Sequence, residues 1–107
     1  MLKDIVRAYK KYPNHAAFVI DDTSYTYKEV FARVQGIMLP VQKVQGDIIG
    51  IVAEDRIETY ASILAVLLSG KTYVILHPNY PASRNRTIAE ITGMNLVLHG
   101  AASEILQ

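Results

Sequence analysis

Residues 48–76 read IIGIVAEDRIETYASILAVLLSGKTYVIL, and this stretch decides the fold. It begins and ends with apolar runs rich in branched residues, Ile48 to Ala53 and Thr72 to Leu76. Such runs are typical of strands covered on both faces, which are usually parallel. Between them, Arg56 to Ser69 carries apolar residues at helical spacing, and Gly70 follows where a C-cap glycine belongs. The stretch therefore predicts a strand, a largely buried helix and a second, parallel strand.

A second crossover follows this unit. Residues 83–92 predict a helix, Gly93 ends it, and residues 95–99 predict a third parallel strand. Because such crossovers are right-handed in almost every known case, both helices would share one side of the sheet if the strands were added in one direction. The order of the strands is not readable from the sequence. We expect an α/β fold of three layers, a mainly parallel sheet flanked by helices in the order βαβαβ.

The chain before this unit predicts a short N-terminal helix and a β-hairpin. Residues 2–12 place apolar side chains at helical spacing, and Pro13 ends the helix. Residues 16–20 and 23–25 are two short extended runs separated by Asp21-Asp22. This pattern predicts a hairpin, although its turn lacks the glycine that two-residue turns favour.

A longer helix is expected next, beginning with a capping box at Thr26-Tyr27-Lys28-Glu29. In this motif the Thr hydroxyl accepts from the N3 amide, and the Glu carboxylate accepts from the N-cap amide. Apolar positions recur on one helix face as far as Met38, and Pro40 is expected to end the helix before a polar connector that runs to Asp47. The halves on either side of the connector are too small to be separate domains, so residues 1–107 should form one domain.

The composition excludes several classes of function. The chain has 107 residues, a net charge of +1 with interspersed signs, and no cysteine. A basic stripe for nucleic acid, a disulfide framework and a thiolate metal site are therefore all lacking. No apolar stretch approaches the roughly 20 residues that a membrane helix needs, and the N-terminus lacks a signal peptide's apolar core. We expect a cytoplasmic protein without membrane or nucleic-acid partners.

Few residues suggest chemistry on their own. His77 follows a predicted strand, and sheets of this type bind ligands beyond the carboxyl ends of their strands, but a loop histidine without a special role is favoured. Glu54 and Asp55 also follow a strand, and we expect them to cap the next helix rather than act as acid or base. The three histidines are too far apart in sequence for a metal site, and the six glycines form no phosphate loop. Tyr73 is expected to be core or half-buried.

Two stretches resemble the first two core motifs of adenylation domains, the ATP-dependent enzymes that activate a carboxylate as an acyl-adenylate before passing it to a thiol. Tyr25 to Val30, YTYKEV, is similar to the family's apolar, Thr or Ser, Tyr, any, Glu, Leu pattern. Residues 67–84, LLSGKTYVILHPNYPASR, are similar to its Leu, Lys, Ala, Gly, any, Ala, Tyr, Val, Pro, Leu, Asp, Pro, any, Tyr, Pro, any, any, Arg run. The second run departs from the pattern at Lys71, Thr72, Ile75 and His77. The spacing fits the family's first subdomain from Ala16 to His99.

The resemblance implies the N-terminal part of an ATP-dependent, carboxylate-activating ligase, closer to amino-acid adenylation in nonribosomal peptide synthesis than to fatty-acyl ligases. It implies ATP and Mg for the parent enzyme. The family's phosphate loop, ribose-binding acid and catalytic Lys have no match here, so we expect no catalytic, cofactor-binding or metal-binding residue and no activity of this chain alone. The matched residues are expected to be framework: Thr26, Tyr27, Glu29, Gly70, Tyr73, Pro78, Tyr80, Pro81 and Arg84.

Two other functions are compatible with the same scaffold. The chain could be a stand-alone interaction module that recruits a partner through an exposed sheet edge or through the surface at the strand ends. It could also be a small ligand-binding domain whose pocket includes His77 and Asp55 near the strand ends. As partners we expect the remainder of the ligase or a second copy of the chain, because a sheet shaped to meet further strands leaves an apolar face or edge uncovered.

Overall fold

The computed structural model describes residues 2–54, 56–79, 81–99 and 102–105. Along the chain the elements are α1 (Leu2–Lys11), β1 (Ala16–Ile20), β2 (Thr23–Thr26), α2 (Tyr27–Lys43), β3 (Ile48–Val52), α3 (Ile57–Leu68), β4 (Thr72–Leu76), α4 (Ala82–Thr92), β5 (Leu96–His99) and β6 (Ala102–Ile105). Every helix in the described part of the chain is too short or too polar to cross a bilayer. The predicted helices and strands are thus all present, together with β6, which was not predicted.

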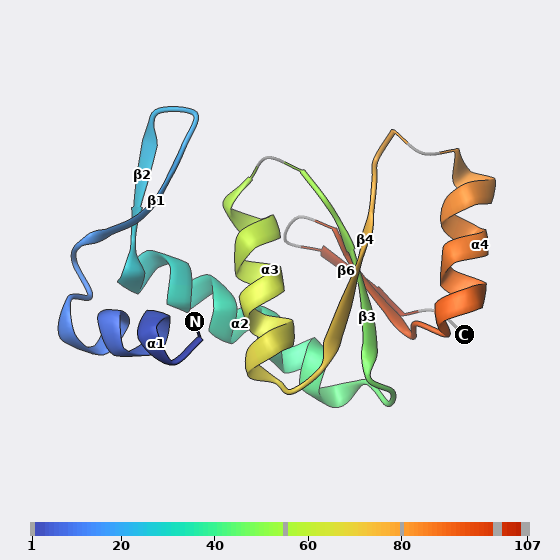
Figure 1. The fold of residues 1–107 in the computed structure, drawn as a ribbon, viewed down its shortest axis with the longest axis horizontal. Coiled ribbons are helices and arrows are strands. Elements are labelled where there is room, and N and C mark those ends of the chain that lie inside the picture. The colour runs from blue at the N-terminus through green and yellow to red at the C-terminus, as the bar shows by residue number, and fades with distance from the viewer. Residues whose placement is uncertain (1, 55, 80, 100–101, 106–107) are drawn as a thin grey trace.

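The main sheet has the strand order β4-β3-β5-β6. Strand β3 pairs in parallel with β4 on one side and with β5 on the other, so the predicted parallel strands are confirmed. Because the second crossover returns across β3, the two helices lie on opposite faces of the sheet, α3 on one and α4 on the other (Figure 1). The strands are therefore not added in one direction, which was the condition for helices on the same side.

The two edges of this sheet differ. Strand β6 pairs antiparallel with β5, from Leu96↔Ile105 to His99↔Ala102. Strand β4 has only β3 as a neighbour among the described strands. Tyr73 on β4 is 37% exposed, so it does not belong to the core, and burial increases along the strand to Leu76, which is 4% exposed. The first residues of β4 are thus the less covered part of this edge.

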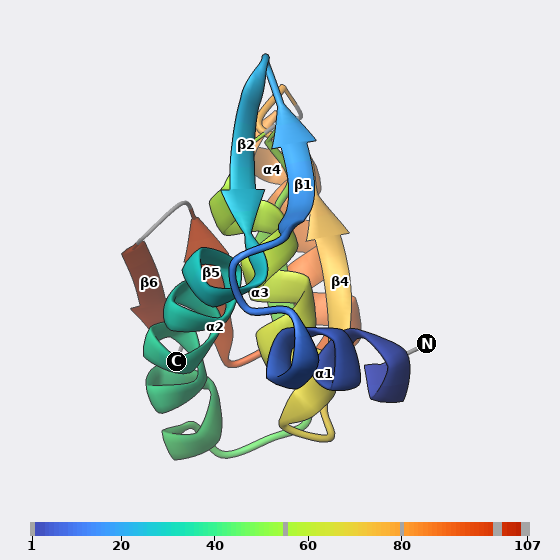
Figure 2. The ribbon, with the colours of Figure 1, turned by 90° about the vertical axis from the view of Figure 1, so that its left-hand side faces the viewer.

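The hairpin β1–β2 stands apart from the main sheet, above α1 in Figure 2. Its strands pair antiparallel up to Ile20↔Thr23. Asp21 and Asp22 both have positive φ, 49° and 66°, which is the geometry of a type I′ turn. Aspartate tolerates this left-handed region better than most residues, so the predicted hairpin forms without glycine.

Helix α2 corrects the expected boundary at Pro40. The helix runs from Tyr27 to Lys43 with Pro40 inside it, so the expected connector begins only after Lys43. An internal proline costs about 3 kcal/mol, but the additional turn places Val41 at 0% exposure against the sheet. Burying a valine contributes about 1.5 to 3 kcal/mol. Tertiary packing thus offsets the local signal that predicted a stop.

The buried apolar residues form two clusters. The first joins α2 to α3 through residues such as Val34 and Leu64, and α1 and the hairpin pack against it. The second lies under the sheet, where Ile49 and Ile51 meet Val41 of α2 together with residues of α3 and β5. Helices α2 and α3 contribute to both clusters and connect the hairpin end of the molecule to the sheet.

Candidate functional site

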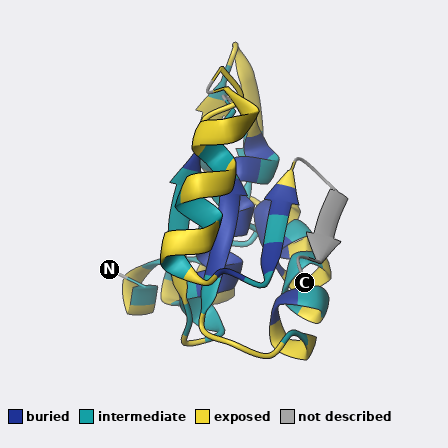
Figure 3. Cartoon of the chain, turned by 90° about the vertical axis from the view of Figure 1, so that its right-hand side faces the viewer, coloured by how far each residue is buried: buried dark blue, intermediate teal, exposed yellow. Residues whose placement is uncertain are grey.

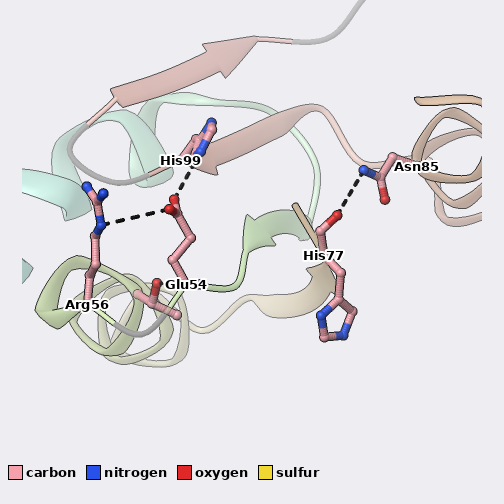
Figure 4. A network of polar contacts seen from close by, with 6 residues as sticks. Glu54, Arg56, His77, Asn85 and His99 are labelled. Carbon is pink, nitrogen blue, oxygen red and sulfur yellow. Dashed lines mark hydrogen bonds and ion pairs between the residues drawn. The ribbon is translucent and has the colours of Figure 1, made fainter. Parts of the chain in front are cut away.

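Parallel pairing brings the carboxyl ends of β3, β4 and β5 to one edge of the sheet, and polar side chains gather there (Figure 4). Glu54 follows β3, His77 follows β4, and His99 is the last residue of β5. The loop after β3 is joined to the end of β4 by a backbone hydrogen bond in which Ala53 N donates to the Leu76 carbonyl at 2.8 Å. This edge is where ligands bind in open sheets of this class.

Glu54 lies at the centre of the group. Its Oε1 is 3.0 Å from His99 Nε2, and its Oε2 is 3.8 Å from Arg56 Nε. Its backbone N–H donates to the hydroxyl of the buried Thr59 at 3.1 Å, which fixes the loop against the first turn of α3. The side chain of Glu54 is 25% exposed, whereas those of Arg56 and His99 are 66% and 61% exposed.

The expected capping of α3 by Glu54 is therefore wrong. The N-cap of this helix is Arg56, which makes no side-chain cap hydrogen bond. The Glu54 carboxylate turns instead toward His99 and Arg56, because two partners that can carry positive charge lie within reach. Asp55, the other predicted acid, lies outside the described residues.

His77 does not join this group. Its imidazole points away from the Glu54 carboxylate (Figure 4), and its backbone carbonyl accepts from Asn85 Nδ2 at 3.3 Å. The pocket proposed for His77 and Asp55 stays a prediction.

The pair of Glu54 and His99 was missed by the sequence reasoning. Glu54 follows one predicted strand and His99 is the last residue of another, which is a signal, but their contact depends on β3 lying next to β5.

This edge offers limited chemistry. A carboxylate facing an imidazole can orient the ring and accept its proton, but the exposed partners leave the group largely in water, where ion pairs contribute about 0 to 1 kcal/mol. No three described His, Asp or Glu side chains lie close enough together to hold a metal ion. The geometry favours a structural role, in which Glu54 ties the loop after β3 to the end of β5.

The residues matched to the family motifs occupy two places. Thr26 and Glu29 form the predicted capping box at the start of α2: Thr26 Oγ1 accepts from Glu29 N at 3.1 Å, and Glu29 Oε1 accepts from Thr26 N at 3.0 Å. The longer run, 67–84, covers the end of α3, the edge strand β4 and the start of α4. That the matched residues act as framework stays a prediction.

Within the longer run, Gly70 has φ +73°, a left-handed conformation that ends α3 as predicted. The carbonyl of Pro81, the N-cap residue of α4, accepts from Arg84 N at 2.9 Å and from Asn85 N at 3.2 Å. Tyr80 lies outside the described residues.

Comparison with known proteins assigns the chain to a family. The sequence profile described as "AMP-binding enzyme" matches residues 5–107. The chain belongs to the AMP-binding enzyme family. The resemblance seen in the motifs is thereby confirmed over nearly the whole sequence.

This member of the AMP-binding family resembles peptide synthetases in particular. It is 32% identical to bacitracin synthase 3 of Bacillus licheniformis over 96 residues, which are 87% of this chain and 2% of that protein. The chain thus spans a small fraction of the length of its curated relative.

Solved structures confirm the fold. The nonribosomal peptide synthetase FmoA3 in its AMPPNP-bound form matches with a TM-score of 0.82 and 25% identity, over 92% of this chain and 11% of that one. The N-terminal subdomain of Klebsiella oxytoca NpsA, in complex with 3-hydroxyanthranilyl-AMSN, matches with a TM-score of 0.77 over 92% of this chain and 26% of that one. At 20% identity the second likeness concerns the fold alone.

Proposed function

We propose that this chain forms the first part of an amino-acid adenylation domain, in an enzyme that uses ATP and Mg to activate a carboxylate for peptide synthesis. The observation that carries the proposal is the AMP-binding family match over residues 5–107. The AMPPNP-bound state of FmoA3 supports nucleotide use by the longer enzyme. The compartment we propose is the cytoplasm, and the 107 residues form a single folding unit that is the N-terminal part of the adenylation domain.

The role of this chain in that enzyme is structural. Attack of a carboxylate oxygen on the α-phosphorus of ATP, with pyrophosphate leaving, needs hydrogen-bond donors and a metal positioned on the developing charge. The six glycines of the sequence are too dispersed to form a phosphate loop, so those donors come from elsewhere in the longer enzyme. The matched residues, from Thr26 to Arg84, hold the sheet and its helices in register as a framework.

A segment exchange tests this proposal. The chain replaces the matching segment of an adenylation domain from bacitracin synthase 3, and amino-acid-dependent ATP–pyrophosphate exchange is measured. We expect exchange by the chimera, none by the 107-residue chain alone, and a loss in the chimera carrying Gly70→Val, because valine is strained at φ +73°. Substrate-dependent exchange by the chain alone would contradict the structural role. A folded chimera without activity would contradict the family role.

The uncovered edge of β4 favours a second property, self-association. This edge strand, TYVIL, is apolar and uncharged, and it lacks the proline, charge or bulge that protects most edges. Pairing with β4 of a second copy would satisfy its backbone groups, so we propose a homodimer formed through the region from Ile48 to His99.

Light scattering at several protein concentrations tests the dimer, with and without residues 1–13. We expect a concentration-dependent dimer in both forms, and a monomer for Tyr73→Lys, which places a charge on the edge. Ile91→Lys adds the same charge on the exposed side of α4 and should leave the dimer intact. A monomer in both lengths would refute the proposal.

A further inference from the structure

Two hollows lie along α1 at the hairpin end of the molecule. The larger has a volume of about 610 Å³ and lies between α1 and Leu68 at the end of α3. The smaller has a volume of about 400 Å³ and lies between the end of α1 and the start of α2, where Tyr9, Pro13 and Lys28 line it. Lys10 lines both hollows, so they adjoin. We call the two together the α1 groove.

The floor of the groove is apolar and can be reached from solvent. Leu2 and Val6 lie one turn apart on the same face of α1, and both line the larger hollow with Leu68. None of the described residues of α1 is buried, and Figure 3 draws this helix, beside the N label, in the colours of exposed and intermediate residues. The ring of Tyr9 stacks on that of Phe31 at 4.5 Å, which holds the wall of the smaller hollow in place. Apolar side chains of a ligand would therefore meet accessible apolar surface here.

The groove is bordered by exposed cations. Those that line it are Lys3, Arg7, Lys10, Lys11 and Lys28. None of them forms an ion pair with a carboxylate of the described residues, and Asp4, the acid of α1, is not among the residues that line either hollow. The cations from Lys3 to Lys10 follow one another at about one helical turn, in a row about 10 Å long. In the sequence Asp4 interrupts them, so the row appears only on the folded helix.

We propose that the α1 groove binds an acidic segment of a partner protein. Its carboxylates meet the row of cations, and its apolar side chains enter the hollow beside Leu2 and Val6. A single small anion would engage only part of a row of this length and would leave the apolar floor unused. The groove lies at the end of the molecule that carries α1, away from the group around Glu54, and the proposal does not depend on the adenylation function.

A bilayer fits this surface less well than a peptide does. The apolar side of α1 is packed against the first cluster of buried residues, so the helix cannot insert its apolar side chains among lipid chains while the fold is intact. The apolar surface that stays accessible lies in a hollow between two helices, which a flat membrane surface does not enter. A protruding side chain of a peptide can enter it.

The test uses synthetic peptides and the 107-residue chain. The probe consists of repeated Glu-Leu-Leu-Glu units, and binding is followed by amide chemical shifts at low ionic strength. We expect a dissociation constant on the order of 100 µM, because exposed ion pairs are individually weak. A peptide with Ser in place of Leu should bind about tenfold more weakly, since it lacks the apolar contacts. A peptide with Lys in place of Glu should not bind. Equal binding of the Ser peptide, binding of the Lys peptide, or shifts that map away from α1 would overturn the proposal.

Matched variants assign the effect to residues. Arg7→Glu reverses a charge in the middle of the row and should weaken the Glu-Leu peptide at least about tenfold. Arg86→Glu makes the same change at an exposed position on α4, at the opposite end of the molecule (Figure 1), and should retain the affinity. Circular dichroism checks that both variants fold, and Lys3→Glu replaces Arg7→Glu if that variant does not. Equal weakening by the variants on α1 and α4 would mean that net charge alone matters, and would refute the site.

Competition decides between anionic partners. Phosphatidylglycerol vesicles or a thymidine oligonucleotide are added to the complex at the same concentration of negative charge as the peptide. We expect neither to displace the peptide, because neither presents an apolar side chain to the hollow beside Val6. Displacement by the vesicles would assign the groove to a membrane surface, and displacement by the oligonucleotide would assign it to nucleic acid. Either result would overturn the proposal.

Discussion

The two faces of the sheet are crossed by helices of nearly equal length, yet the helices are held in different ways. Seven residues of α3 are buried, among them Ala61, Ala65 and Val66 at 0% exposure. Helix α4 has no buried residue and borders a cavity. The sequence IETYASILAVLL is apolar on most of its surface, whereas ASRNRTIAEIT offers few apolar side chains. One crossover helix is thus largely buried, whereas the other lies mostly exposed.

The largest expected effect compares side-chain truncation on the two faces. Leu64→Ala in α3 removes a side chain that is 6% exposed, and we expect a loss of about 3 kcal/mol in the free energy of unfolding. Ile91→Ala in α4, where the side chain is 79% exposed, should change it by less than about 0.5 kcal/mol. Urea unfolding followed by circular dichroism measures both. Similar losses for the two variants would show that α4 packs as tightly as α3.

A smaller effect concerns the C-terminal ends of α3 and α4, where the same substitution should reduce the stability of both helices equally. Gly70 and Gly93 have φ +73° and +69°, and an added Cβ would meet no atom within 4 Å at either position. Gly70→Ala and Gly93→Ala should each cost about 1 to 2 kcal/mol, because only the left-handed backbone is strained. Thermal unfolding compares them, and a cost restricted to Gly70→Ala would mean that α4 adjusts its end freely.

The smallest expected effect concerns the start of α2, which has a capping box. The two crossover helices, α3 and α4, begin without a side-chain cap hydrogen bond. Thr26→Ala removes the hydroxyl of the capping box and should cost about 1 kcal/mol. Chemical denaturation at neutral pH measures this loss. An unchanged free energy of unfolding would show that the box adds nothing to the start of α2.

The same capping box makes stability depend on pH. The pKa of Glu29 is lowered below 4.5, most of all by the hydrogen bond from the backbone N–H of Thr26. The hydrogen bond with the Thr26 side chain and the charge of Arg33 lower it further. Because the folded pKa is the lower one, the stabilisation is complete above the unfolded pKa and is lost as pH falls through the folded pKa. In the Thr26→Ala variant the pKa of Glu29 should rise only part of the way to 4.5, because the backbone N–H of residue 26 still donates to its carboxylate. A carboxyl chemical-shift titration checks this, and an unchanged pKa would contradict it.

Much of the fold could be predicted because its signals are local. The strands of 48–76, the helix between them, the capping box at Thr26 and the left-handed Gly70 and Gly93 all follow from residue type and periodicity. The predicted helix end at Pro40 was wrong because the prediction considered only the local cost of the proline. The additional turn buries Val41, and this burial depends on strands that come later in the chain.

The candidate site was harder to predict than the fold. Whether Glu54 caps α3 or faces His99 depends on which strand lies beside β3, and both arrangements of the strands fit the same sequence pattern. The cavity beside α4 gives no local signal either, because it depends on how α4 lies relative to β4 and β5. Gly50 was a visible exception in an apolar strand, and a glycine there often marks close approach of a neighbour.

The proline inside α2 has a consequence for local unfolding. Pro40 has no N–H to donate to the carbonyl of Gly36, so the weakest turn of the helix lies between Val34, which belongs to the first cluster, and Val41, which belongs to the second. The amides on either side are thus protected from hydrogen exchange by different hydrophobic clusters. We therefore expect the first turns of α2 to exchange with the hairpin end of the molecule and its last turn to exchange with the sheet, while α3, which contributes to both clusters, connects the two.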